Sequence, residues 1–319
     1  MRKILIASLM FLLFIPQSVW GQEKLRVGKS VAVTFEFFPL DFGLELGVWK
    51  KRGLDLEVFT FRGGGPLEQA MAAGSLDIGL TAATSIAGAI AKGATGKIIA
   101  SIGSRPTLMV LIVGKESGIK GLSDLKGKRI GVTSHGSLTD WLAKRLSSHL
   151  GWDPETGITR VPLGGLTAQL AALKVKNTDG FIWSAEGGYD AEEKGLGTII
   201  LSFGEILKDF EFEVIEASDE ILKRNPEAVR KFLQGWYEVI RYMKANKEHT
   251  IKRMAELYQL PLGVVRKTYE LDIGNLSENG TLNMKGLQVV AESLVELKIS
   301  PRPLDVKKMY DDRFLPVRP

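Results

Sequence analysis

The chain has 319 residues, 45% hydrophobic and 25% charged, with a mean hydropathy of +0.04, which excludes a disordered or fibrous protein. It carries 42 Lys and Arg against 37 Asp and Glu, interspersed along the chain, so we expect neither nucleic acid nor an anionic membrane as its main partner. The absence of cysteine excludes disulfides, thiol catalysis and cysteine-bound metals, and the three histidines lack metal-ligand spacing.

The amino terminus has the layout of a cleavable secretory signal. Arg2 and Lys3 precede an apolar run at residues 4–15, shorter than the roughly 20 residues that a membrane-spanning helix needs. We predict cleavage after Gly21, which removes residues 1–21. The cleavage point offers no cysteine for a lipid anchor, and export without a tether favours a periplasmic location.

From residue 25 onward, short β-branched runs alternate with helical segments, which predicts an α/β protein with parallel-type sheets. The helices have recognisable start and stop signals. A helix at 44–51 is predicted to end at Gly53, another to begin at Pro66, and a third to be capped by Ser134 or Ser137. Strands are predicted at residues 26–34, 54–61, 77–80, 97–102, 108–113, 129–133, 157–162, 180–182, 198–201 and 211–217.

The carboxyl-terminal third changes character and shows helical spacing at residues 226–245, 248–257, 261–269 and 283–297. Two extended segments, at 102–113 and 210–217, bracket a central block with its own βα units. We therefore predict two lobes joined by two crossover strands. Residues 22–106 with 216–319 form lobe 1, and residues 107–215 form lobe 2. The predicted site is the cleft between them.

Motifs for catalysis and metal binding fail on inspection. The run from Gly131 to Gly136 lacks the first glycine of a nucleophile elbow, and residues 93–98 lack the spacing of a phosphate-binding loop. No zinc-protease motif or EF-hand loop occurs. We therefore predict a protein that is not an enzyme and that uses no cofactor and no metal.

Small polar residues gather instead at three strand-to-helix junctions, at residues 81–85, 134–139 and 164–167. The first N–H groups of a helix lack intrahelical partners, and the helix dipole favours negative charge there. Three such junctions around one cleft predict a small anionic solute. The alternative for any one of them is a plain helix cap, worth about 1 kcal/mol to folding.

Other side chains near the same strand ends complete the predicted site. Aromatic residues would line the pocket unless they belong to the core, and Arg62 would form an ion pair with an anion unless it is solvated. His135 would donate a hydrogen bond to an anion. Glu186 would contact an amine or bridge the lobes. The predicted ligand-binding residues are Phe37, Phe38, Arg62, Gly64, Thr81, Thr84, Ser85, Ser134, His135, Gly136, Ser137, Gly165, Trp183 and Glu186.

Several runs of the sequence resemble a known family. Residues 47–57 (GVWKKRGLDLE), the Gly63-Gly64-Gly65-Pro66 turn, residues 70–80 (AMAAGSLDIGL) and residues 117–132 are similar to the solute-binding proteins of nitrate, sulfonate and taurine importers, the broad group that includes thiamine-pyrimidine binders. The likeness covers residues 25–242. Asp140 stands after the Gly-Ser-Leu-Thr junction where the family often has His, so a sulfonate ligand does not simply carry over.

The resemblance implies a type II periplasmic binding fold that closes two lobes on a solute. It also implies delivery to an inner-membrane ABC permease with a cytoplasmic ATPase, and we expect the binding protein to act as a monomer. Two alternatives stay open. One is a pyrimidine binder or a related-fold enzyme acting on a pyrimidine or small acid, and the other is a ligand-sensing partner of a membrane receptor.

Overall fold

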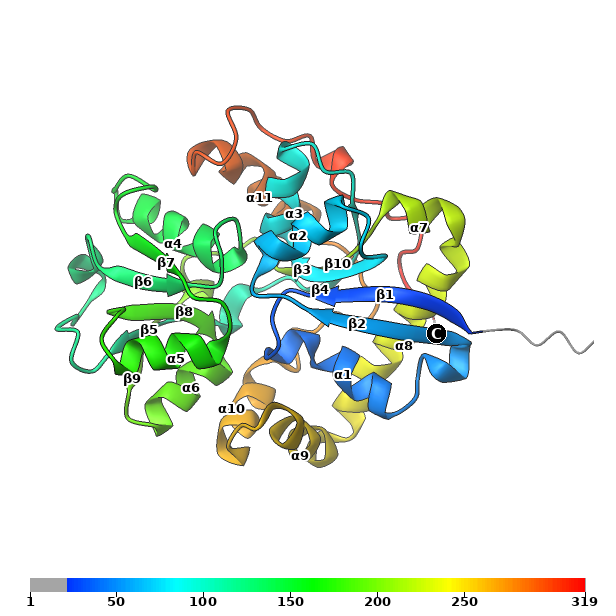
Figure 1. Cartoon of the computed structure of the whole chain (residues 1–319), viewed down its shortest axis with the longest axis horizontal. Helices are drawn as coiled ribbons and strands as arrows, with labels where there is room; N and C mark the ends of the chain where they lie inside the picture. The colour runs from blue at the N-terminus through cyan, green and yellow to red at the C-terminus, as the bar shows by residue number, and fades with distance from the viewer. Residues whose placement is uncertain (1–21, 319) are drawn as a thin grey trace, which may run out of the picture.

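The computed structural model describes residues 22–318 and shows an α/β fold built on two five-stranded sheets. Each sheet is the centre of one lobe, and the two lobes lie side by side with helices around them (Figure 1). The predicted fold class is confirmed. The predicted signal at residues 1–21 lies outside the described residues. Within residues 22–318, none of the helices has the length and apolar character needed to cross a membrane.

The sheet of lobe 1 has the strand order β2-β1-β3-β10-β4. Its strands are β1 (Glu23–Lys29), β2 (Leu54–Thr60), β3 (Ile78–Ala82), β4 (Lys97–Gly103) and β10 (Glu213–Ala217). β1 runs parallel to β2 and β3, whereas β10 runs antiparallel to both of its neighbours. Every residue of β3 and β10 is buried, as expected for central strands covered on both faces.

The sheet of lobe 2 has the order β7-β6-β8-β5-β9. Its strands are β5 (Met109–Gly114), β6 (Arg129–Val132), β7 (Thr159–Pro162), β8 (Gly180–Ser184) and β9 (Gly197–Ser202). β6 runs parallel to β7 and β8, and β5 runs antiparallel to β8 and β9. Each lobe therefore has one reversed strand in an otherwise parallel arrangement.

The reversed strands follow from the way the chain crosses between the lobes. It passes from β4 to β5 and returns from β9 to β10, so the first strand after each crossing starts at the cleft and runs away from it. The other strands run towards the cleft. Consequently the amino ends of β5 and β10, at Met109 and Glu213, meet the carboxyl ends of β3 and β8 in the same place.

Helices that follow the strands begin beside the cleft. In lobe 1 these are α2 (Gly64–Ala72) after β2 and α3 (Ala83–Ala91) after β3, and in lobe 2 they are α4 (Leu138–His149), α5 (Leu166–Lys174) and α6 (Ala185–Glu193). The strand-to-helix junctions expected from the sequence are therefore present.

The predicted helix at 44–51 is wrong. The structure has instead the 3-10 turn η1 (Phe35–Phe37), helix α1 (Phe38–Glu45) and a second 3-10 turn, η2 (Lys50–Arg52). The aromatic-rich segment before residue 44 is buried and packs as helix, and Gly47 interrupts the chain with a φ of 68°. The predicted stop at Gly53 is correct, since its φ is 75°.

The carboxyl-terminal third is helical, as predicted, with α7 (Asp219–Arg224), α8 (Pro226–Ala245), α9 (Lys247–Tyr258), α10 (Leu262–Asp272) and α11 (Met284–Glu296). Helices α8 and α9 lie on lobe 1, α10 packs against α9 and against α6 of lobe 2, and α11 lies against α3 (Figure 1). α11 also reaches lobe 2, because the indole Nε1 of Trp141 donates to Ser293 Oγ at 3.0 Å. The carboxyl-terminal segment thus contacts both lobes.

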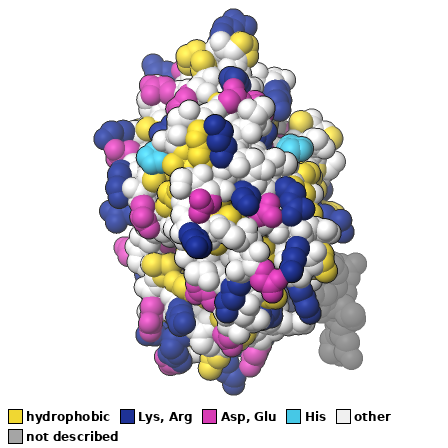
Figure 2. Space-filling model, turned by 90° about the vertical axis from the view of Figure 1, so that its left-hand side faces the viewer, with side chains coloured by type: hydrophobic (Ala, Val, Ile, Leu, Met, Phe, Trp, Pro, Cys, Tyr) yellow, Lys and Arg dark blue, Asp and Glu magenta, His cyan; other side chains and the backbone are white. Residues whose placement is uncertain are grey.

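The end of the molecule formed by lobe 2 carries basic and acidic side chains mixed over its surface (Figure 2). Many of these charges are paired, for example Arg129 with Asp179 at 2.9 Å and Lys176 with Glu116 at 2.5 Å. The interspersed charge seen in the sequence therefore persists on this face as mixed charge.

Candidate functional site

A small cavity lies between the lobes, and we call it the inner cavity. Its volume is about 40 Å³, enough for a few water-sized atoms in this closed arrangement. Both lobes and both reversed strands contribute to its wall. The lining residues are Ser30, Val31, Thr34, Gly64, Ala82, Ser85, Met109, Thr133, Ser137, Leu138, Thr139, Trp183, Ser184 and Glu213.

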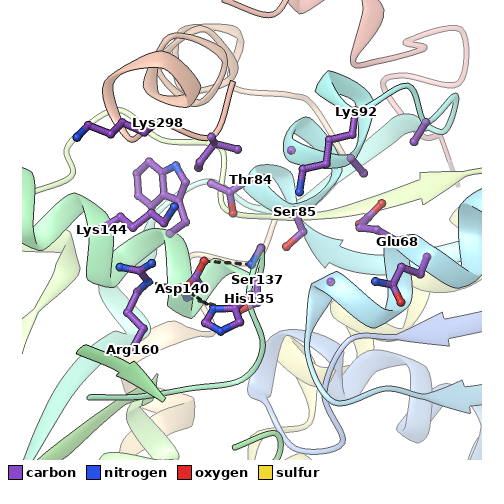
Figure 3. A pocket seen from close by; sticks show the side chains of 18 of the residues that line it. Glu68, Thr84, Ser85, Lys92, His135, Ser137, Asp140, Lys144, Arg160 and Lys298 are labelled. Carbon is purple, nitrogen blue, oxygen red and sulfur yellow. Dashed lines mark hydrogen bonds and ion pairs between the residues drawn. The ribbon is translucent and has the colours of Figure 1, made fainter. Parts of the chain in front are cut away.

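A larger depression of about 530 Å³ lies beside it, and we call it the outer groove. Ser85 and Ser137 line both spaces, so they mark the boundary between them. In Figure 3, Thr84 and Ser85 on α3 face Ser137 and His135 across the groove. The lining is charged at its outer part, where Glu68, Lys92, Asp140, Lys144, Glu155, Arg160 and Lys298 contribute.

Two residues that line the inner cavity, one from each lobe, carry a buried hydrogen-bond donor without a protein partner. Ser85 Oγ in lobe 1 and Trp183 Nε1 in lobe 2 are buried, and neither has a hydrogen bond within the described residues. The helices α2 and α3 also begin here with no side-chain cap. Buried polar groups are rarely left unpaired, so these donors indicate a place where a bound molecule accepts hydrogen bonds.

The start of α4 differs, because the hydroxyl groups at this junction already form hydrogen bonds within the protein. Ser137 Oγ accepts from Asp140 N at 3.4 Å and donates to the carbonyl oxygen of Ser134 at 2.7 Å. Thr139 Oγ1 accepts from Thr133 N at 2.8 Å. Ser137 is therefore a helix cap, the alternative considered for it. Its hydroxyl still lines the inner cavity, but the helix beneath it needs no ligand.

The wall also contains a buried carboxyl group. Glu213 is 8% exposed, and its Oε2 has no hydrogen-bond partner within residues 22–318. Burial raises the pKa of Glu213 to about 8, since a charged carboxylate loses its hydration there. Residue 213 is the first of β10, so its side chain lies where a reversed strand starts at the cleft.

Beside the inner cavity, matching hydroxyl and carboxyl pairs from the two lobes meet. Thr34 donates to Glu36 in lobe 1, and Ser184 donates to Glu186 in lobe 2. The two hydroxyl oxygens are 3.3 Å apart across the cleft. Burial raises the pKa of Glu186 to about 7 and that of Glu36 well above its usual range, with the charges of Asp272 and neighbouring carboxylates adding to the shift.

The outer groove has a different electrostatic character, because its charges are largely neutralised within the protein. Arg160 Nε donates to Asp140 Oδ1 at 2.7 Å, and Lys144 pairs with Glu155. Lys298 pairs with Asp153 at 2.5 Å. These cations already have partners, so the groove offers less unpaired charge than its residue types imply.

The backbones of the two lobes approach each other closely at the edge of the outer groove. A Cβ atom added at Gly65 in α2 would lie 2.5 Å from the carbonyl oxygen of His135 in lobe 2. Real Cβ atoms do not approach a carbonyl oxygen this closely, so the closed arrangement requires glycine at this position. The three-glycine turn is therefore a contact surface between the lobes.

The structure brings together part of the predicted site. Gly64, Ser85, Ser137 and Trp183 line the inner cavity, and Thr84, Ser85, His135, Gly136 and Ser137 line the outer groove. His135 is largely exposed, and its Nδ1 lies 3.4 Å from Asp140 Oδ1. The remaining predicted residues line neither space: Phe37, Phe38, Arg62, Thr81, Ser134, Gly165 and Glu186.

The two phenylalanines belong to the core, the alternative considered for them. Phe37 and Phe38 are fully buried, and Phe38 stacks on Phe42 with ring centroids 5.1 Å apart. Tyr258 meets Phe38 edge-on at 5.5 Å. They do not wall the pocket, because α1 turns them into lobe 1. Arg62 is exposed and packs against Gly164 at the rim.

Sequence reasoning missed several residues that line the inner cavity. Ser30, Val31 and Thr34 follow β1, where the predicted strand ran too far. Ser184 was not predicted, although it directly follows the predicted Trp183 and stands at the N-cap position of α6. Glu213 was not predicted because the site was expected at the carboxyl ends of strands, whereas this residue begins β10. The only signal available was an acidic residue inside an apolar crossover segment.

Comparisons with known proteins place this architecture among relatives. Residues 34–250 match the family described as NMT1/THI5-like. A protein of Brucella abortus (strain 2308) named "Putative binding protein" is 25% identical over 327 residues, 97% of each chain. The 4-amino-5-hydroxymethyl-2-methylpyrimidine phosphate synthase THI5 of Saccharomyces cerevisiae is 27% identical over 225 residues, 65% of this chain and 63% of the yeast protein.

Solved structures share the fold. The alkanesulfonate-binding protein SsuA from Xanthomonas axonopodis pv. citri, bound to MOPS, superposes with a TM-score of 0.77 at 20% identity. The match covers 90% of this chain and 98% of that one. The type II periplasmic binding architecture expected from the sequence is thereby confirmed.

Proposed function

This chain belongs to the NMT1/THI5-like family, and we propose that it is a solute-binding protein that closes its two lobes on a small molecule with an anionic or acceptor group. One observation carries the proposal. Within residues 22–318, Ser85 Oγ from lobe 1 and Trp183 Nε1 from lobe 2 are buried donors without partners, and both residues line the inner cavity. A ligand that accepts from both is held fully only when the lobes are closed.

Hinge closure gives such a protein its affinity. A ligand shifts an equilibrium between open and closed states only by the difference in its affinity for the two. Donors on opposite lobes supply that difference, and the uncapped starts of α2 and α3 add a favourable potential for negative charge. The size of the inner cavity favours a small head group, with any larger part extending past Ser85 and Ser137 into the outer groove.

The role in the cell follows from the same proposal. We expect the mature protein to act in the periplasm as a monomer and to deliver its solute to an ABC permease in the inner membrane. The Brucella relative, which carries the name "Putative binding protein" and matches 97% of this chain, supports a binding function. Genes for a permease and an ATPase beside this one would support transport, and a receptor gene there would favour sensing.

An enzyme of the pyrimidine synthase type is the second candidate, because the yeast relative carries that name. His135 is the exposed side chain at the groove that such chemistry would use. Formation of a pyrimidine product by the purified chain, abolished by His135→Ala, would favour the enzyme.

A thermal-shift panel tests the binding function directly. The mature chain is heated with nitrate, small sulfonates, small carboxylates and pyrimidines, each in excess. A ligand at 100 times its Kd adds about 2.7 kcal/mol to the free energy of unfolding, and the melting temperature rises accordingly. A Trp183→Phe variant should respond less to the same ligand. If no small solute raises the melting temperature, the proposal is wrong.

A further inference from the structure

A row of four oxygen atoms crosses from one lobe to the other, and we call it the interlobe chain. It runs from Glu36 Oε2 to Thr34 Oγ1 in lobe 1, and then to Ser184 Oγ and Glu186 Oε1 in lobe 2. The two outer contacts lie within a lobe. The middle contact, 3.3 Å between the two hydroxyl oxygens, joins the lobes. All four residues are buried, so water does not replace these contacts.

The three contacts of the interlobe chain need three protons, one for each hydrogen bond. The hydroxyl groups of Thr34 and Ser184 supply one proton each, and an ionised carboxylate only accepts. When Glu36 and Glu186 are both ionised, two protons therefore serve three contacts. Hydrogen bonds to a charged acceptor are the stronger ones, so the carboxylates take both protons. The two hydroxyl oxygens then face each other across the lobes with no proton between them.

One additional proton on a carboxyl group completes the chain. A protonated Glu36 donates to Thr34, Thr34 donates to Ser184, and Ser184 donates to an ionised Glu186. The other oxygens of the two carboxyl groups, Glu36 Oε1 and Glu186 Oε2, have no hydrogen-bond partner within residues 22–318, so the oxygens of the chain are the favoured places for the proton. The hydrogen bond between the lobes thus requires a proton that neither hydroxyl group supplies.

The acidic surroundings favour this additional proton. Burial raises the pKa of Glu186 to about 7 and that of Glu36 well above its usual range. Asp272 on α10 and Glu213 on β10 face the chain from lobe 1, and their negative charges raise the pKa of Glu36 further. Helix α10 packs against both η1 and α6, so it covers the carboxyl groups of both lobes.

The remaining charged and titratable groups on this side are tyrosines and paired or distant lysines. The pKa values of Tyr258 on α9 and Tyr189 on α6 are raised by burial, so both side chains stay neutral. Tyr258 donates to Asp41 at 2.8 Å, and Lys29 is paired with the same carboxylate at 2.6 Å. Lys267 Nζ lies 5.6 Å from the centre of the Tyr189 ring. The hydrogen-bond partners of the two glutamates are hydroxyl groups instead.

We propose that the interlobe chain is a proton-dependent latch, which holds the lobes closed while Glu36 or Glu186 is protonated and releases them when both are ionised. The proposal rests on the proposed function only for the movement of the lobes, and it goes beyond that function because the latch acts without a solute. Opening admits water to the carboxyl groups, so the open state binds fewer protons than the closed state. Closure should therefore weaken as the pH rises from about 4.5, the ordinary pKa of a glutamate, through the raised values of the closed form.

Spin labels measure the latch in the absence of any ligand. The chain contains no cysteine, so Lys51→Cys in lobe 1 and Lys126→Cys in lobe 2, both at exposed positions, direct one label to each lobe. Double electron–electron resonance gives the fractions of short and long distances at pH 6 and pH 9, and circular dichroism checks that the protein stays folded. We expect the closed-to-open ratio to be about tenfold lower, or less, at pH 9 than at pH 6, because one proton contributes up to about tenfold per pH unit.

Three variants of the labelled protein assign the effect. Glu36→Gln should stay closed at pH 9, because its amide N–H donates to Thr34 at every pH and completes the chain. Thr34→Val removes the middle hydrogen bond and should lower the closed-to-open ratio at pH 6 to the value of the parent at pH 9. Glu216→Gln is the matched control. Its carboxyl group is also buried, with a pKa raised to about 8, but it lies in β10 outside the chain, so the pH dependence should persist.

The outcomes separate the latch from the proposed function. Equal distances at both pH values in the parent, a Glu36→Gln variant that opens at pH 9 as the parent does, or loss of the pH dependence in Glu216→Gln would each overturn the latch. If a solute raises the melting temperature and the distances do not change with pH, the latch fails and the proposed function stands. If the distances follow the pH and no solute raises the melting temperature, the proposed function fails and the latch stands.

Discussion

The inner cavity and the outer groove share Ser85 and Ser137, yet their charged groups are in different states. In the outer groove, Arg160 and Lys144 are paired with carboxylates and are nearly buried. In the inner cavity, Glu213 Oε2 has no hydrogen-bond partner within residues 22–318. The larger space is therefore the one in which most basic side chains already have a partner.

This difference indicates where binding energy is available. A paired charge must lose its partner before it can hold a ligand, whereas an unpaired buried group gains a hydrogen bond without losing one. Ligand affinity should therefore depend on the inner cavity, and folding stability should depend on the ion pairs of the groove. The predictions below test that division.

Arg160→Met should lower the free energy of unfolding by about 3 kcal/mol, because it leaves the buried Asp140 without its cation. Ligand affinity should stay within about twofold. Lys298→Met, in the same groove but with an exposed pair to Asp153, should change the free energy of unfolding little. Urea denaturation measures both variants. A large loss of affinity in Arg160→Met with intact folding would contradict the division.

Gly65→Ala should weaken binding by about 10- to 100-fold, since a misfit at a packed contact costs about 1–3 kcal/mol. The added Cβ would lie 2.5 Å from His135 O of the other lobe, and movement of the lobes apart would relieve this clash. X-ray scattering should show a larger radius of gyration than for the parent. Gly263→Ala is the control, because its added Cβ has no neighbour within 4 Å. Unchanged affinity in both variants would mean that closure does not bring these backbones together.

Stability should fall as the pH rises from about 5 to 8.5. Burial raises the pKa of Glu211, Glu213 and Glu216 to about 8, from 4.5 for an ordinary glutamate. Below pH 4.5 both the folded and unfolded states are protonated. Between these values the folded state holds more protons, so its stability decreases until the folded groups have titrated.

Glu213→Gln should flatten this profile by up to about 1.4 kcal/mol per pH unit, the contribution of one proton. The exposed Glu193→Gln should leave the profile unchanged. Unfolding free energies at half-unit steps of pH measure the slopes. Parallel curves for the parent and Glu213→Gln would show that Glu213 is not held protonated by burial.

Trp183→Phe should weaken ligand binding by about fivefold to tenfold through loss of one hydrogen bond. In the ligand-free protein it should cost only the packing lost to the smaller ring at this buried position, because the indole N–H has no partner to lose within residues 22–318. Trp141→Phe should cost more stability and keep the ligand affinity, since Trp141 Nε1 donates to Ser293 Oγ. A destabilised Trp183→Phe with full affinity would place that indole in the core rather than in the site.

Local patterning predicted most of the fold. The alternation of short apolar runs with helical segments predicted the strands, and the sequence offered Ser137 as a possible cap, which its bond with Asp140 N confirms. The helix at 44–51 failed because several buried aromatic residues before it pack as helix, and their burial is a tertiary property. For the same reason Phe37 and Phe38 were assigned to the pocket and lie in the core.

The sequence by itself determined the class of the fold, the junctions rich in hydroxyl groups and the membership of a family, because these depend on local propensity and on residue order. The tertiary structure alone decided that β5 and β10 are reversed, and so that Glu213 lies in the cavity wall opposite unpaired donors. Which polar groups find partners depends on distances between segments far apart in the chain, and such distances exist only after the lobes have packed.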